Sequence, residues 1–116
     1  MAYDVDLADR LRELLATEAT LTEMKMFGGL AFLVGGNMAI AASGQGGLLV
    51  RVDPTETDEL VGSTSAEPFV MRGKPMPGWL RVGDEHVRAD AELAVWANRG
   101  TAFARSLPPK HSAARA

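Results

Sequence analysis

The chain has 116 residues, of which 47% are hydrophobic and 23% are charged, and it contains no cysteine. A chain of this length fits one domain, and the composition is that of a folded globular protein rather than a disordered one. The missing cysteines exclude disulfide bonds, thiolate metal ligands and a cysteine nucleophile. The chain starts with acidic residues, 1–6, and lacks the basic and apolar segments of a signal peptide, so we expect a cytoplasmic protein.

The formal net charge of −3 is unevenly distributed. Residues 1–69 carry a balance of −7 and residues 70–116 a balance of +4. No five consecutive residues are basic, so we interpret the asymmetry as a dipolar domain rather than a nucleic-acid tract. The longest weakly charged stretch, 26–50, is interrupted by glycines, which predicts strands and turns and no membrane span.

The first half of the chain predicts a helix followed by a β-meander. Leucines at 7, 11, 14 and 15 recur on one face of a helix over 4–19, which Asp4 or Asp6 can cap. From residue 20 the period changes to two, and alternation over 20–26 predicts a strand with one face on the core. Short apolar runs at 30–34, 38–42 and 48–52, separated by glycine turns, predict further antiparallel strands.

The second half predicts a short helix, two strands and a long helix. Asp53 and Pro54 are typical of a helix start, and this helix is expected to end near Gly62. Strands are predicted at 69–71 and 79–82, and two prolines between them favour an ordered loop over 72–78 instead of a tight hairpin. The last helix is predicted over 90–107, with Gly100 on its apolar face, where it would allow close approach of another backbone.

No catalytic, cofactor or metal site is predicted. The glycine clusters lie between strands and open no helix, so they are interpreted as turns and not as phosphate loops. His86 follows Glu85 directly, and sequence neighbours tend to diverge, so a metal site is not expected there. No Gly-x-Ser-x-Gly pattern is present, and the prediction is therefore a non-enzymatic protein.

Methionines are numerous for this length. Those at strand positions are predicted to fill the core: Met24, Met26, Met38 and Met71. Met76 lies between two prolines, and we interpret it as part of an adaptable binding surface with Trp79, or as packing over the sheet edge.

The order of motifs resembles the TfoX N-terminal domain family, also called TfoX/Sxy-like. The motifs are Lys-Met-Phe-Gly-Gly at 25–29, Gly-Asn-Met at 36–38, Leu-Val-Arg-Val at 49–52 and Gly-Lys-Pro-Met-Pro-Gly-Trp at 73–79, and they are followed by a helix with Trp96 and Phe103. The resemblance covers roughly residues 3–109.

The resemblance implies an α+β domain and a part in regulating DNA-uptake competence. The namesakes act as coactivators beside a cyclic-AMP-responsive transcription factor, and they carry a second, helical C-terminal domain. The resemblance accounts for nearly all of this chain with the first domain alone, so we expect a single-domain member. The family supplies no catalytic residues to carry over.

Taken together, we expect one domain over 1–109 and a frayed tail over 110–116. The expected fold is α+β, an antiparallel sheet of about five or six strands with the N-terminal and C-terminal helices on one face. The expected function is a regulatory, protein-binding module with an unidentified protein partner, and a homodimer is left open. The candidate partner-binding residues are Lys25, Phe27, Gly28, Gly29, Arg72, Lys74, Met76 and Trp79.

Two alternatives remain open at this stage. One is weak direct nucleic-acid binding through the basic residues of the second half, which requires their side chains to converge on one face. These residues are Arg72, Lys74, Arg81, Arg99, Arg105 and Lys110. The other is a small-molecule enzyme or binder with a pocket between sheet and helices, which requires several ionisable groups with perturbed pKa values.

Overall fold

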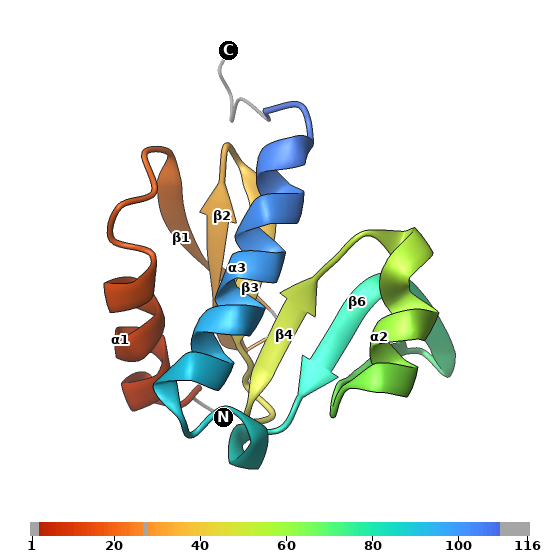
Figure 1. Ribbon diagram of the computed structural model, residues 1–116. Coiled ribbons are helices and arrows are strands. Elements are labelled where there is room, and N and C mark those ends of the chain that lie inside the picture. The colour runs from red at the N-terminus through yellow and green to blue at the C-terminus, as the bar shows by residue number, and fades with distance from the viewer. Residues whose placement is uncertain (1–2, 27, 110–116) are drawn as a thin grey trace.

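The computed structural model describes residues 3–26 and 28–109. In these residues three α-helices cover one face of a six-stranded antiparallel sheet (Figure 1). This architecture confirms the predicted α+β class, with the N-terminal and C-terminal helices on one face. The predicted tail, 110–116, and the candidate Phe27 lie outside the described residues.

Helix α1 spans Val5–Leu14 and ends earlier than the predicted residue 19. The Asp4 carboxylate caps it by accepting a hydrogen bond from the Leu7 amide at 3.2 Å. Beyond the helix, Thr20 accepts a hydrogen bond from the Gly35 amide through its hydroxyl oxygen, at 2.9 Å. This bond ties the chain to the turn between the second and third strands, so the backbone must leave the helical path before residue 20.

The next four strands form the predicted meander. They are β1 (Leu21–Met26), β2 (Gly29–Val34), β3 (Asn37–Ala42) and β4 (Leu48–Arg51). Strands β5 (Glu67–Met71) and β6 (Lys74–Val82) complete the sheet in the order β1-β2-β3-β4-β6-β5. All neighbouring strands are antiparallel, and β1 and β5 are the two edges.

The predicted loop over 72–78 is wrong, because β5 and β6 form a tight hairpin. Met71 pairs with Lys74, and the two loop residues, Arg72 and Gly73, both have positive φ (55° and 80°), as in a type I′ turn. The prolines at 75 and 77 lie in the part of β6 that extends beyond the end of β4, where no β4 residue needs their missing N–H groups.

A short helical segment connects β4 to β5, as predicted. The Asp53 side chain caps a 3₁₀ turn over Pro54–Glu56, which continues into α2 (Thr57–Ser63). The buried Thr57 hydroxyl oxygen accepts a hydrogen bond from the Gly78 amide at 2.8 Å, which fixes α2 to β6.

Helix α3 (Asp90–Ser106) crosses β2, β3 and β4 and closes the main core. Gly100 is buried against β3, where an added Cβ would collide with the Ala39 carbonyl oxygen. The prediction of close backbone approach at this glycine is confirmed. The main core joins helix and strand side chains, and its largest fully buried members are Phe32, Leu7, Leu11, Ile40, Leu48, Leu80 and Leu93.

Replacing Gly100 with alanine should destabilise the protein although alanine favours helices. The new methyl group must displace the β3 backbone, and overpacking of this kind costs about 1–3 kcal/mol. The matched control is Gly62→Ala in α2, where a Cβ meets nothing within 4 Å, and there alanine should be neutral or stabilising by up to about 1 kcal/mol. Urea unfolding of both variants checks this, and equal effects would contradict the close-contact explanation.

Candidate interaction surface

The face of the sheet opposite the helices carries a second apolar cluster, which we call the uncovered face. Its five buried side chains all come from strands: Ala31, Leu33, Met38, Ala41 and Leu49. Three half-buried side chains, Met26, Phe69 and Trp79, pack against this cluster. No helical residue of the described ranges belongs to the cluster. Its five central side chains are each at most 8% exposed, so a partner would contact mainly the half-buried rim.

The apolar runs in the sequence produce this face because the middle strands bury both of their sides. Every residue of β2 and β3 is buried, which is typical of strands with apolar contacts above and below. In β2, Phe32 belongs to the main core, whereas its neighbours Ala31 and Leu33 belong to the second cluster. The continuous apolar run at 30–34 therefore supplies two surfaces rather than one.

Strand β1 extends the uncovered face to the sheet edge. Met24 lies opposite Ala31 in the β1–β2 register, and its side chain is 51% exposed. The prediction that Met24 fills the core is wrong, because the alternation of β1 turns it away from the helices. Met38 is buried as predicted, although in the second cluster and not in the main core.

At the other end of the uncovered face, Arg51 lies between two aromatic rings. Its guanidinium carbon is 5.3 Å from the centroid of Trp79 and 5.6 Å from that of Phe103. Such cation–π contacts are attractive and hold the guanidinium in place. Arg51 pairs with Trp79 across β4 and β6, so the cation links α3 to the rim of the uncovered face.

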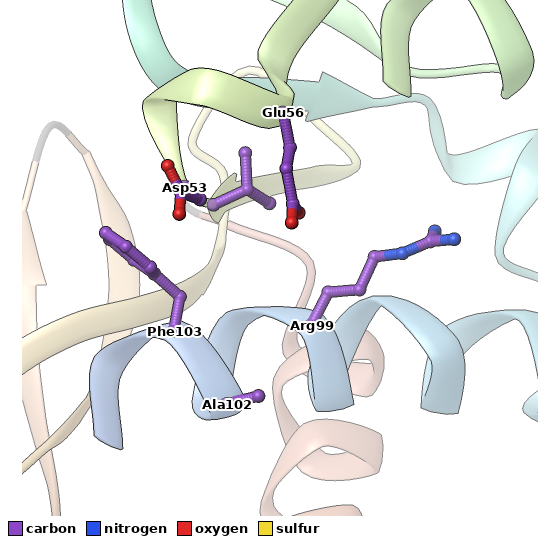
Figure 2. Close-up of a pocket in the computed structure, with 6 residues that line it drawn as sticks. Asp53, Glu56, Arg99, Ala102 and Phe103 are labelled. Carbon is purple, nitrogen blue, oxygen red and sulfur yellow. The ribbon is translucent and has the colours of Figure 1, made fainter. Parts of the chain in front are cut away.

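A hollow of about 280 Å³ separates α3 from the 3₁₀ turn after β4 (Figure 2). Figure 2 shows the Glu56 carboxylate pointing toward α3, while the Arg99 guanidinium points away from Asp53. Arg99 lies over the Trp96 ring at 4.6 Å. No ion pair joins these three charged residues, all of which lie within the described part of the chain.

The pKa of Asp53 lies below its ordinary value because its carboxylate accepts two hydrogen bonds from Thr55. The backbone amide of Thr55 donates at 2.9 Å and its hydroxyl at 2.8 Å. These bonds form the cap of the 3₁₀ turn, so the shift has a structural cause that requires no ligand.

A second groove, of about 440 Å³, lies between α2 and the β5–β6 hairpin. Its lining is rich in proline and comprises Pro54, Thr57, Asp58, Val61, Pro68, Pro75, Met76 and Pro77. Met76 therefore faces α2, whereas Trp79 packs on the uncovered face. The predicted joint surface of these two residues does not form.

The structure also separates the two stretches of candidate partner-binding residues. Lys25 is on β1, Gly28 is in the following turn and Gly29 begins β2, whereas Arg72 and Lys74 are at the β5–β6 turn. Strands β2, β3 and β4 lie between β1 and β6. What the two stretches share is the uncovered face, because Met26 and Trp79 form opposite parts of its rim.

The basic residues of the second half do not converge. Arg81 lies opposite Leu49 on the uncovered face, whereas Arg99 and Arg105 are on α3, which packs on the other face. Arg105 is paired with Glu18, and Arg72 and Lys74 are at the hairpin turn. Lys110 lies outside the described residues. This dispersion removes the geometric support for a nucleic-acid surface.

Within residues 3–26 and 28–109, no group of three or more acidic and histidine side chains is placed to hold a metal ion. His86 is exposed and lies 3.6 Å from Glu85. No helix in the same ranges has the length and apolar character needed to cross a membrane.

Sequence reasoning missed Met24, Phe69 and Leu49 as parts of a surface. For Met24 the available signal was the alternation of β1, in which Met24 and Met26 occupy one side and Leu21, Glu23 and Lys25 the other. Because Glu23 reaches Arg12 of α1, the charged side faces the helices, and the methionines face away from them.

Comparison with known proteins identifies one family. The TfoX N-terminal domain family matches the chain over residues 13–104. No curated protein matches the chain. The matched range includes all six strands and most of α3.

Replacing Asp53 with alanine should lower stability at pH 7 and do so less in acid. A depressed pKa in the folded state contributes stability that is present above the ordinary aspartate pKa and is lost as the pH falls through the folded value. Urea unfolding at pH 7 and near pH 2.5 measures the free energy of unfolding of the wild type and the alanine variant. The difference between these two free energies should be smaller near pH 2.5 than at pH 7. Asp53→Asn, which keeps a non-titrating acceptor, should lose less at pH 7. A difference for the alanine variant that is independent of pH would contradict the cap role.

Proposed function

The chain belongs to the TfoX N-terminal domain family, and we propose that it is a non-enzymatic regulatory module that acts by binding another protein. The observation that carries this proposal is the uncovered face, which is apolar from Met26 to Trp79. The centre of this face is buried, but Met24 is 51% exposed and Met26, Phe69 and Trp79 are half-buried. Apolar side chains that solvent reaches are typical of interaction sites. The resemblance to competence regulators, which act beside a transcription factor, supports the same class of function.

The chemistry of the uncovered face favours a protein partner with an apolar centre. Met24 is exposed and Met26 is half-buried, and both supply flexible, polarizable side chains that adapt to different shapes. Arg51 and Arg81 add positive charge at the β4–β6 end of the same face. A partner with an apolar patch over the methionines and a carboxylate near these arginines would bind both parts of the face.

The hollow beside α3 supports an enzyme less well. It presents the carboxylates of Asp53 and Glu56 and the guanidinium of Arg99, of which Asp53 is already used as a cap. Its remaining lining, Val52, Ala102 and Phe103, offers no nucleophile. We therefore place the function on the uncovered face.

Replacing Trp79 with alanine should weaken binding to the partner by about tenfold or more, because aromatic side chains often contribute most of the binding energy at interfaces. The partner to test first is the cyclic-AMP-responsive transcription factor from the same organism, immobilised for biolayer interferometry. Wild-type protein should bind it saturably.

The matched control is Met76→Ala, three residues away on the same strand but in the groove beneath α2. This variant should bind like the wild type, and circular dichroism should show that both variants are folded. Absence of saturable wild-type binding would overturn this choice of partner. Equal losses at Trp79 and Met76 would overturn the assignment to the uncovered face. If the Trp79 variant does not fold, Phe69→Ala replaces it as the test of the uncovered face, because Phe69 lies on the same rim.

A further inference from the structure

The outer edge of β1 has the properties of a strand that can pair with another chain. β1 is the terminal strand of the sheet, and its six residues pair with β2 in an unbroken register from Leu21↔Val34 to Met26↔Gly29. It contains no proline and no bulge. One row of its backbone N–H and C=O groups therefore has no strand partner in the described residues, and such edges pair readily with other strands.

The opposite edge differs. β5 contains Pro68, which cannot donate a backbone hydrogen bond, and its register with β6 is broken between Pro68 and Val70. Proline and irregular pairing are devices that protect edge strands from association. Of the two sheet edges, only β1 lacks proline and irregular pairing within the described residues. Its charged residues, Glu23 and Lys25, disfavour pairing with a strand that carries no matching charges.

The charges of β1 form a self-complementary pattern. Glu23 and Lys25 are two residues apart and lie on the helix side of the strand, one on each side of Met24. Arg12 holds the Glu23 carboxylate through two hydrogen bonds, from Nε to Oε2 at 2.7 Å and from Nη2 to Oε1 at 2.9 Å. The same contacts hold the pKa of Glu23 below its ordinary value, so the carboxylate is charged at neutral pH. Lys25 takes part in no ion pair among the residues described.

We propose that two copies of this chain associate through antiparallel β1–β1 pairing, with Met24 on the two-fold axis. In this register Glu23 of each copy lies opposite Lys25 of the other, and Met24 lies opposite itself. Opposite charges directly across an antiparallel pair attract each other, and like charges repel. Both ionic contacts occur on the helix side, and the Met24 pair occurs on the uncovered face.

The alternatives in register are less favourable. In an antiparallel pair, residues directly opposite each other place their side chains on the same face of the sheet. Neighbouring residues of one strand face opposite sides, so a two-fold axis must pass through a residue and not between two. A centre at Glu23 would place two glutamates opposite each other, and a centre at Lys25 would do the same with two lysines. Centres at Leu21, Thr22 or Met26 would leave Glu23 opposite an uncharged residue. Only a centre at Met24 places opposite charges across the pair. The proposal does not depend on the function assigned to the uncovered face.

The absence of cysteine in the chain allows a direct test by disulfide cross-linking. Separate single variants, Glu23→Cys, Met24→Cys and Lys25→Cys, are oxidised at low protein concentration and run on a non-reducing gel. A residue on the two-fold axis lies within about 4.5–5.5 Å of its own copy, which suits a disulfide. Residues 23 and 25 lie about 7–8 Å from their own copies, which is beyond the usual disulfide range. Met24→Cys should therefore cross-link at least about tenfold faster than the other two. The controls are Val70→Cys on β5 and Val95→Cys on α3, which are 55% and 44% exposed and should stay uncrosslinked.

Charge variants test the same register without a cysteine. Lys25→Glu should shift the monomer–dimer equilibrium toward monomer in sedimentation velocity, because it places glutamates opposite each other. The exchange Glu23→Lys with Lys25→Glu restores opposite charges across the axis and should restore the dimer. Thermal unfolding checks that each variant is folded, since Glu23→Lys also removes the Arg12 contact.

A wild-type protein that stays monomeric over about a hundredfold range of concentration would overturn the proposal. Preferential cross-linking at Glu23→Cys or Lys25→Cys would overturn the register, and cross-linking at Val70→Cys would assign the interface to the other edge.

Discussion

The contact between α3 and β3 at Gly100 is the constraint on which the rest of the fold depends. The glycine lies so close to the Ala39 carbonyl that no side chain fits between them. Ala39 coincides with a shift in the β2–β3 register, where Phe32 pairs with Ile40 and Leu33 with Met38. The extra residue places Ala39 and Ile40 together in the main core, which is where α3 packs.

Helix α3 lies on the centre of the sheet, and all of the described helices are on this side. Apart from Asn37, the residues of β2 and β3 are nevertheless apolar, so the opposite side is also apolar. Trp79 and Phe69 cover part of this second cluster from one end, and Arg51 is held between Trp79 and Phe103. The uncovered face is thus a direct consequence of placing two-sided strands under helices that pack on one side.

Local sequence patterns predicted most of the fold, and what they failed to predict depends on tertiary contacts. The apolar face of α3, the cap at Asp53 and the glycine turns of the meander all act within a few residues of the chain. The β5–β6 hairpin could not be predicted from its prolines, because their tolerance depends on where β4 ends. Met24 was misplaced for a related reason. Its strand alternates clearly, but alternation does not reveal which side the helices cover.

The same limit applies to the candidate surface. The motifs at 25–29 and 73–79, which carry the family resemblance, lie on strands that are far apart in the sheet order. Neither motif forms the surface alone. Met26 and Trp79 contribute to one face only because Leu33, Met38 and Leu49 lie buried between them. In the sequence, these three residues have the pattern of ordinary core strands.

Edge pairing at β1 and partner binding on the uncovered face are geometrically compatible. A two-fold axis through Met24 that runs perpendicular to the sheet keeps the uncovered faces of both copies on the same side. The exposed Met24 side chains would then meet at the centre of one continuous apolar surface, and the helices of both copies would remain on the opposite side. Such a dimer would double the area available to a partner without adding a residue. It would also cover the most exposed apolar side chain of β1. A partner of matching two-fold symmetry would gain most from this arrangement, because both of its halves could bind at once.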